Sequence, residues 1–224
     1  KDQWPMLVGF SDITALHSLL SLHGVASLHA NMCKDLSLLP DEDIALSAER
    51  EFFMADTIPS PLSFTSHLLP LTYHPSPHHA NVPYTIHHTS SSPLNRGGEV
   101  VGKLIGGNLS VLYGLQGTPY SLNKIIEQCE QPPILFIEDI SENHYHIDRM
   151  LNSLRMSAVF DSIGGLVVGQ FTDCADDPSM GCSLLESIRQ VVDDYSFPIL
   201  FDYPSGHIDS NYPLLLSADY LLSV

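Results

Sequence analysis

The sequence predicts an α/β protein built from two units. Segments with the pattern of buried strands alternate with segments of helical period along most of the 224 residues. A hydrophobic content of 44% is enough to form a substantial core, which excludes a disordered chain. A stretch rich in Pro, Ser and His runs from about residue 58 to 95 and is typical of a linker. We therefore expect a first unit over residues 1–90, which includes this linker from about 58, and a second unit over residues 95–224.

The first unit contains the signals of two strands and two helices. Ile13, Leu16 and Leu20 recur at the spacing of one helix face, so we expect these side chains to point inward. Glu49 and Glu51 are expected near the start of the second helix, where the helix dipole favours acids. The expected elements are strands over residues 6–10 and 25–30 and helices over residues 13–24 and 47–56. So few elements cannot close a doubly wound sheet, and the unit is expected to be incomplete.

The linker and the second unit continue the alternation. Residues 66–72 and 82–88 resemble strands, and their prolines restrict them to sheet edges. Gly106-Gly107-Asn108 is expected to form a turn. The second unit is expected to have strands over 99–105, 134–137, 165–171, 198–201 and twice within 213–224, and helices over 109–115, 145–156 and 183–195.

Composition excludes several classes of protein. Acidic residues outnumber basic ones 26 to 9, for a formal charge of −17, so we expect neither nucleic-acid binding nor attachment to anionic membranes. No apolar run reaches the length of a membrane span, and the first residues lack the pattern of a signal peptide. The 4 cysteines form no Cys-x-x-Cys pair, which indicates reduced thiols and a cytoplasmic location.

Ser11 lies where a predicted strand gives way to a helix. Gly9 permits a sharp turn, Ser11 follows, and the helix begins at once, which is the layout of a nucleophile elbow. Backbone N–H groups at the start of that helix are available to stabilise an oxyanion. The alternative is that Ser11 or Asp12 is an ordinary N-cap, and the pattern alone favours this more common arrangement.

Two further positions carry groups that suit acid–base chemistry. Glu138 and Asp139 stand at the carboxyl end of a predicted buried strand, where either carboxylate is well placed to orient a histidine. His207 follows another strand in a Pro- and Gly-containing loop and suits a general base. The alternatives are helix-capping or solvated carboxylates and an ordinary loop histidine.

Histidines and glycine pairs give weaker signals, for a metal site and for a phosphate loop. Half of the 12 histidines lie in the linker region, which raises metal binding as an alternative, but their spacing matches no ligand motif. These histidines are His67, His74, His78, His79, His87 and His88. The two Gly-Gly pairs are not followed by Gly-Lys-Ser, so a P-loop is excluded.

Four segments, in the same order, resemble the LD-carboxypeptidase family of serine peptidases, which also contains the microcin C immunity proteins. The matching segments are GFSDITALH at 9–17, LIGGNLS at 104–110, LFIED at 135–139 with IDRML at 147–151, and PSGH at 204–207. The resemblance implies a Ser-His-Glu triad in which Ser11 is the nucleophile, His207 the base and Glu138 the orienting acid. It also implies that the Asp12 backbone N–H is an oxyanion donor.

The same resemblance implies the fold and the reaction. It implies a flavodoxin-like N-terminal domain, present here in part, and a smaller β/α C-terminal domain, with the site at their junction. The expected reaction is hydrolysis of an L,D-amide bond that releases the terminal D-Ala of murein tetrapeptides, with no cofactor and a peptide or muropeptide substrate. The alternatives are an immunity-type hydrolase of peptidyl or aminoacyl nucleotides, for which Tyr73 and Tyr84 offer aromatic platforms, and a non-catalytic binding module.

The chain departs from the family pattern before the nucleophile. Family members have a substantial segment there, with a Gly-rich turn that supplies another oxyanion donor, so we expect this chain to be N-terminally truncated. The uncovered sheet is expected to expose apolar surface, which predicts association of the chain, as a homodimer.

Overall fold

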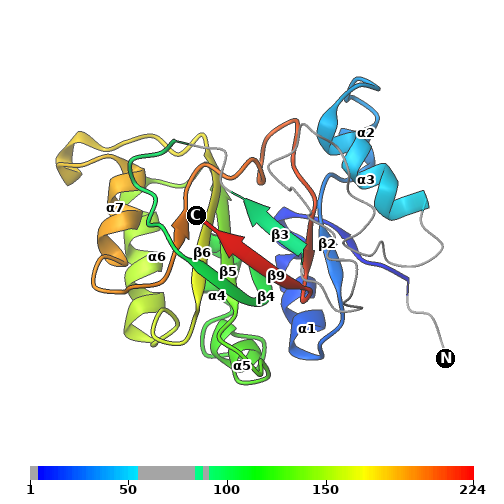
Figure 1. Cartoon of the computed structure of the whole chain (residues 1–224). Coiled ribbons are helices and arrows are strands. Elements are labelled where there is room, and N and C mark those ends of the chain that lie inside the picture. The colour runs from blue at the N-terminus through cyan, green and yellow to red at the C-terminus, as the bar shows by residue number, and fades with distance from the viewer. Residues whose placement is uncertain (1–4, 55–83, 88–90) are drawn as a thin grey trace.

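The computed structural model describes residues 5–54, 84–87 and 91–224, and within these residues the strands form two sheets (Figure 1). The large sheet has the strand order β3-β9-β4-β5-β6-β7 and the small sheet has the order β1-β2-β8. The large sheet consists of β3 (Tyr84–His87), β9 (Asp219–Ser223), β4 (Glu99–Asn108), β5 (Ile134–Ile140), β6 (Gly165–Thr172) and β7 (Ile199–Leu200). The small sheet consists of β1 (Val8–Gly9), β2 (Ser27–His29) and β8 (Leu214–Leu216). The predicted α/β class is confirmed.

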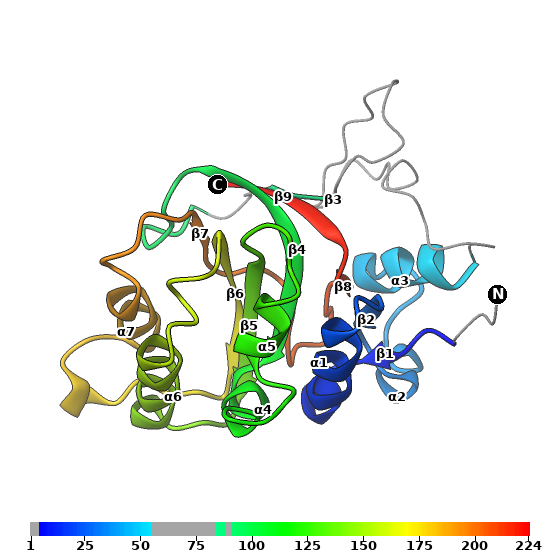
Figure 2. The ribbon, with the colours of Figure 1, turned by 90° about the horizontal axis from the view of Figure 1, so that it is seen from below.

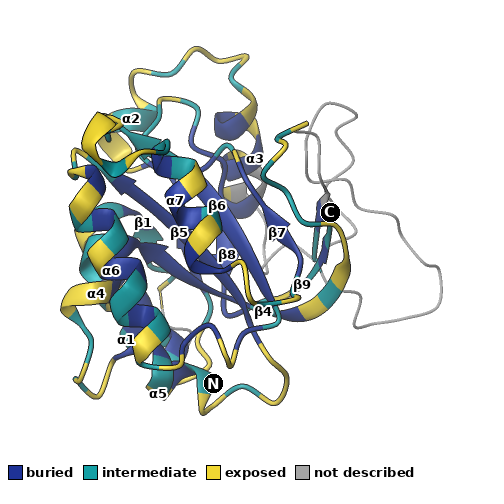
Figure 3. Ribbon diagram, turned by 90° about the vertical axis from the view of Figure 1, so that its left-hand side faces the viewer, coloured by how far each residue is buried: buried dark blue, intermediate teal, exposed yellow. Residues whose placement is uncertain are grey.

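Parallel strands form one side of the large sheet, from β4 to the β7 edge, as expected for strands joined by helices. β4, β5, β6 and β7 pair in parallel, and α6 and α7 lie side by side along this part of the sheet (Figure 2). The connecting helices are α4 (Leu109–Gly114), α5 (Leu122–Ile126), α6 (His144–Met156) and α7 (Leu184–Val191). The helix expected over residues 145–156 is present as α6, and its Ile147, Leu151 and Leu154 are fully buried. The strands are buried while the outer sides of these helices are exposed (Figure 3).

Helix α1 (Thr14–Leu22) contacts both β4 and the small sheet, but not with the face that we predicted. Leu16 is 48% exposed, so the expected apolar face is wrong. The buried residues of α1 are polar or small: Thr14, His17, Ser18 and Ser21. His17 bonds to Ser27 Oγ at 2.7 Å and to the Gly9 carbonyl oxygen at 3.0 Å. Small polar side chains with partners allow α1 to lie close against the neighbouring strand β4.

Strand β4 continues through the residues that we expected to form a turn. Gly106 and Gly107 pair with β5 in parallel register, so that prediction was wrong. Their backbones have φ values of 128° and 138°, which favour glycine. A Cβ at Gly106 would overlap the Phe136 carbonyl oxygen, and one at Gly107 would lie 2.6 Å from Thr14 Oγ1. The glycines therefore allow neighbouring backbone and helix to approach β4 closely.

Two helices follow strand β2 along the chain: α2 (Cys33–Leu36), which the sequence analysis did not predict, and α3 (Ile44–Met54). Helix α3 begins earlier than expected, so Glu49 lies in its middle rather than near its start. Glu49 is fully buried and accepts a hydrogen bond from the Asn31 backbone N–H at 2.9 Å. Burial raises the pKa of Glu49 to about 7. The predicted role as a dipole-stabilising acid is therefore wrong.

The linker enters the fold through one strand. β3 lies at the edge of the large sheet and pairs in parallel with β9, which confirms an edge strand within residues 82–88. The other expected strand, at 66–72, lies outside the described residues. The tail forms β8 and β9, as predicted. None of the helices in the described ranges is long and apolar enough to cross a membrane.

Candidate active site

Ser11 lies at a strained turn between β1 and α1. Its φ of 66° falls in the left-handed region that non-glycine residues rarely adopt. A 3-10 turn, η1 (Ser11–Ile13), leads from it directly into α1. The N-cap positions of η1 and α1 are Phe10 and Ile13, so neither Ser11 nor Asp12 is an N-cap. The backbone geometry is that of a strand–turn–helix elbow.

The structure brings together the three side chains that the sequence analysis selected. His207, in the loop between β7 and β8, has its Nε2 2.9 Å from Ser11 Oγ. Its Nδ1 lies 2.7 Å from Glu138 Oε2. Because a carboxylate only accepts hydrogen bonds, Nδ1 donates to Glu138, and Nε2 of the neutral ring is free to accept the Ser11 proton.

Glu138 is held at the carboxyl end of β5 and is fully buried. On one side β5 pairs with β4, and on the other its register with β6 shifts between Ile137 and Asp139. Such an irregularity changes the direction in which side chains point. Gly206, at a φ of 133°, brings the His207 loop against the acid, since a Cβ there would lie 3.1 Å from Glu138 Oε2.

The two rival carboxylates have other partners. Asp139 accepts hydrogen bonds from Asn108 Nδ2 at 2.9 Å and from Ser110 Oγ at 2.6 Å, which attach it to the start of α4. Glu142 lies 2.9 Å from His146 Nδ1 on helix α6. Of these three neighbouring acids, Glu138 is the one that contacts His207.

The charges of the pair reinforce one another. Burial alone would raise the pKa of Glu138, but interactions with His207 and His29 outweigh burial and lower that pKa. Burial alone would likewise lower the pKa of His207, but the hydrogen bond and charge of Glu138, with smaller contributions from Asp139 and Asp12, raise it overall. Both shifts favour an ion pair between Glu138 and a protonated His207.

The backbone N–H of Asp12 follows Ser11 in the first turn of η1. N–H groups in the first turn of a helix have no partner within that helix. They also lie at the positive end of the local backbone dipole. This N–H is therefore available to a negatively charged oxygen near Ser11.

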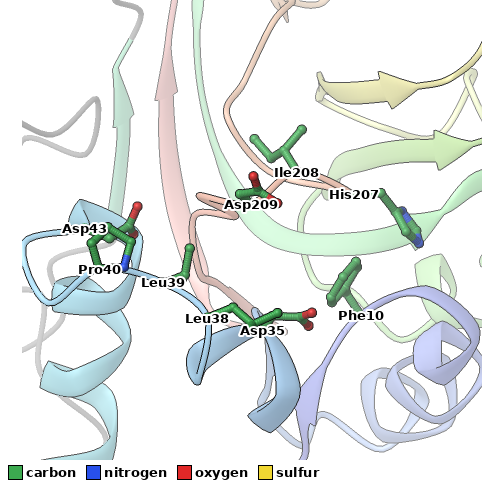
Figure 4. Close-up of a pocket in the computed structure, with 9 residues that line it drawn as sticks. All are labelled: Phe10, Asp35, Leu38, Leu39, Pro40, Asp43, His207, Ile208 and Asp209. Carbon is green, nitrogen blue, oxygen red and sulfur yellow. The ribbon is translucent and has the colours of Figure 1, made fainter.

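A pocket of about 550 Å³ opens beside His207 (Figure 4). It lies between Phe10, which joins β1 to η1, the segment from α2 to α3, and the His207 loop. Its lining residues are Phe10, Asp35, Leu38, Leu39, Pro40, Asp43, His207, Ile208 and Asp209. These described residues include three aspartates and no Lys or Arg. The lining therefore favours an ammonium group over a carboxylate.

The structure offers no support for a metal centre in the part of the chain that it describes. Among residues 5–54, 84–87 and 91–224, no group of three or more His, Cys, Asp or Glu side chains is arranged to hold a metal ion. The side chains of the six linker histidines lie outside the described residues.

Sequence reasoning missed one residue beside the site, His29 at the end of β2. It is fully buried, and its Nε2 lies 3.9 Å from Glu138 Oε1. A polar residue inside a predicted apolar strand was the available signal.

Comparison with known proteins identifies the family. A model of the LD-carboxypeptidase C-terminal domain matches residues 101–222, more than half of the chain. The chain belongs to the LD-carboxypeptidase family. It is 30% identical over 216 residues to the probable murein peptide carboxypeptidase of Bacillus subtilis, which covers 94% of this chain and 57% of that protein. It is also 30% identical over 205 residues to the murein tetrapeptide carboxypeptidase of Pseudomonas aeruginosa, covering 90% and 57%. The chain thus spans 57% of the length of these two relatives.

Solved structures of LD-carboxypeptidase relatives share the fold. The muramoyltetrapeptide carboxypeptidase of Oxalobacter formigenes matches with a TM-score of 0.70 at 24% identity, over 98% of this chain and 65% of that one. The microcin C7 self-immunity protein MccF, in complex with aspartyl sulfamoyl adenosine, matches with a TM-score of 0.65 at 20% identity, over 97% and 64%. At these identities the likeness concerns the fold alone.

Proposed function

We propose that this protein is a serine carboxypeptidase that hydrolyses an L,D-amide bond and releases the terminal D-Ala of murein tetrapeptides. The observation that carries the proposal is the continuous contact from Ser11 Oγ through His207 to the buried carboxylate of Glu138. Relatives named as murein peptide and murein tetrapeptide carboxypeptidases support the substrate class.

In the first half of the proposed reaction, Ser11 Oγ attacks the carbonyl carbon of the scissile amide. His207 Nε2 accepts the proton of the hydroxyl, and Glu138 stabilises the imidazolium that forms. The Asp12 N–H donates to the carbonyl oxygen as it becomes negatively charged. His207 then returns the proton to the leaving amine, D-Ala departs, and an ester to Ser11 remains.

In the second half, water replaces the departed amine beside His207. His207 Nε2 takes a proton from that water as its oxygen attacks the ester carbonyl. Collapse of this intermediate breaks the ester bond, and the same proton returns to Ser11 Oγ. These two steps need acid–base groups, an oxyanion donor and water, and they use no cofactor.

We propose a division near residues 90–95 into a unit that carries Ser11 and a unit that carries Glu138 and His207. We also propose a cytoplasmic homodimer, which size-exclusion chromatography with light scattering tests directly.

A second candidate function is hydrolysis of peptidyl or aminoacyl nucleotides. The microcin C7 self-immunity protein MccF of Escherichia coli, 29% identical over 120 residues, covering 53% of this chain and 32% of that protein, favours it. The nucleobase of such a substrate needs an aromatic side chain on which to stack. Tyr84 instead stacks on Tyr220, with ring centroids 5.2 Å apart. Tyr73 lies outside the described residues. The murein reading therefore has the stronger support.

Incubation of the purified protein with two substrates separates these functions. The first is a murein tetrapeptide ending in D-Ala, with the same peptide ending in L-Ala as its control, and the second is an aminoacyl sulfamoyl adenosine. Mass spectrometry is expected to detect release of D-Ala alone. Cleavage of the nucleotide alone would favour the immunity-type function, and inertness toward all of them would favour a non-catalytic module.

A further inference from the structure

Two buried polar atoms face each other behind the candidate active site. His29 Nε2 and Glu138 Oε1 lie 3.9 Å apart, and both side chains are fully buried. Neither atom has a hydrogen-bond partner. The other oxygen of the same carboxylate, Oε2, is bound by His207. An unpaired oxygen on a buried carboxylate is strongly unfavourable, so this arrangement calls for a donor at Oε1.

The chemistry of the two groups decides which atom donates. An ionised carboxylate has no hydrogen to give, so only an N–H on His29 makes the contact attractive. A bare Nε2 would point a lone pair at a carboxylate oxygen. N–H···O hydrogen bonds span about 2.7–3.2 Å, so a shift of about 1 Å closes the gap.

The rest of the His29 ring is held by the loop that carries the base. Its Nδ1 lies 3.4 Å from Ser205 Oγ, two residues before His207. Ser205 has one hydroxyl hydrogen, for which the Tyr212 carbonyl oxygen at 2.9 Å and Asn211 Oδ1 at 3.0 Å compete with His29. When this hydrogen points to His29, Nδ1 accepts it and Nε2 carries the hydrogen of the neutral ring. The ring packs edge-on against Phe136 of β5, with centroids 5.0 Å apart. His29 therefore contacts both the strand of the acid and the loop of the base.

The ionisable groups that face His29 are few among the described residues. Glu138 lies at 3.9 Å from its Nε2, and His17 of α1 has its ring centroid 6.3 Å away. Burial lowers the pKa of His17 to about 4, so this neighbour stays neutral through the range in which the site works. A substitution of His29 should therefore act mainly on the ionisation of Glu138 and, through Glu138, on that of His207.

We propose that His29 is a positioning residue that donates its Nε2–H to Glu138 Oε1, so that the acid is held between two imidazoles. The proposal deepens the proposed function, on which it rests. With Oε1 occupied by His29, the carboxylate cannot rotate away from His207, and Oε2 remains aimed at His207 Nδ1. His29 touches no reacting atom and acts through Glu138.

Removal of the donor has an effect whose sign follows from electrostatics. A carboxylate that loses a hydrogen bond binds protons more tightly, and the His207–Glu138 pair takes up its first proton at higher pH. In His29→Leu we therefore expect the midpoint of acid inactivation to move to higher pH. We also expect kcat to fall on the order of 10-fold with KM unchanged, because the lost hydrogen bond to a charged group acts in the transition state.

A conservative variant and a matched control separate positioning from packing. His29→Gln retains an N–H donor and is expected to restore the midpoint and most of kcat. His17→Gln alters another buried histidine, bonded to Ser27 and Gly9 rather than to Glu138. This control is expected to melt at lower temperature with the pH midpoint unchanged. A folded His29→Leu protein with the normal midpoint would overturn the proposal.

A further measurement on the unaltered protein depends neither on turnover nor on whether a substituted protein folds. In ¹⁵N spectra of histidine-labelled protein near neutral pH, His29 Nε2 is expected to carry a hydrogen. A bare Nε2 there would overturn the proposal whether or not the protein cleaves peptides. A protonated Nε2 in a protein that cleaves no substrate would instead leave the positioning role intact and reject the proposed function.

Discussion

The two sheets hold opposite ends of the Ser11–His207–Glu138 site by different means. β5 carries Glu138, pairs with a strand on each side, and has six buried residues among its seven. β1, which leads to Ser11, has two residues and, within the described chain, pairs with β2 alone. The position of the acid therefore follows from a well-packed sheet, whereas the position of the hydroxyl depends on one strained turn.

This difference predicts where substitutions act. Changes at the Ser11 turn remove chemistry and leave the large sheet intact. Substitutions at the end of β5 should affect catalysis where the carboxylate contacts His207, and stability where it contacts the start of α4.

The largest effect is expected at the strained turn. Ser11→Ala removes the proposed nucleophile and should lower kcat for D-Ala release by about 10⁶-fold. Alanine is as strained as serine at a φ of 66°, so the melting temperature should stay near that of the unaltered protein. Turnover that persists in the folded Ser11→Ala protein would exclude Ser11 as the nucleophile.

At the large-sheet end, neighbouring carboxylates should behave differently. Glu138→Gln removes the charge that stabilises the His207 imidazolium and should lower kcat by about 10⁴-fold. Asp139→Asn alters the hydrogen bonds to Asn108 and Ser110 and should reduce stability by about 1–3 kcal/mol while turnover persists. Glu142→Gln serves as the control and should change little. A crippled Asp139→Asn beside a normal Glu138→Gln would reverse the assignment of the acid.

The pH dependence joins the two ends of the site. Only neutral His207 accepts the Ser11 proton, and its pKa is raised, so the acid limb of kcat/KM should have its midpoint above the ordinary histidine value of 6.5. Below that midpoint the rate should fall about 10-fold per pH unit. A group whose pKa is raised in the folded state contributes stability that is lost as pH rises through that pKa. The contribution of the His207–Glu138 pair to the stability of the fold should therefore decline over the pH range in which activity rises.

In Glu138→Gln, the residual activity should titrate at lower pH. The charge that raises the pKa of His207 is then absent, and burial lowers this pKa. A pH profile that is unchanged by Glu138→Gln would show that another group controls the acid limb.

The smallest effect is expected at the glycine where the His207 loop meets Glu138. Gly206→Ala places a Cβ 3.1 Å from Glu138 Oε2 at a φ of 133° and should lower kcat by about 10-fold. Gly24→Ala is the matched control, because its φ is 66° and no atom lies within 4 Å of the added Cβ. The control should lose about 1–2 kcal/mol of stability and keep full activity.

The parts of the fold with strong periodicity were predictable. The buried faces of α6 and α7 and the buried run of β5 follow from the spacing of apolar residues alone. The face of α1 did not, because its buried side consists of polar groups whose partners lie on β2, β4 and the Ser217 turn. Side chains satisfied by tertiary partners leave no hydrophobic period to read.

The candidate site was predictable only in part, for a related reason. The local sequence pattern placed Ser11, Glu138 and His207 at the ends of strands. It could not distinguish catalytic residues from ordinary N-caps and loop residues, and the four ordered segments that resemble the family made that distinction. His29 was missed because one histidine in a short apolar strand carries no sign of the carboxylate it will face. Glu49 was misplaced because its partner, the Asn31 N–H, lies on another segment.

Reaction with a serine-directed fluorophosphonate, followed by peptide mass mapping, tests the activated Ser11 most directly. A single adduct is expected on Ser11, formed more slowly as pH falls through the His207 titration. The labelling rate should drop sharply in Glu138→Gln and stay near normal in Asp139→Asn. An adduct on another residue, or equal labelling of the Ser11→Ala protein, would contradict a nucleophile at Ser11 activated by His207 and Glu138.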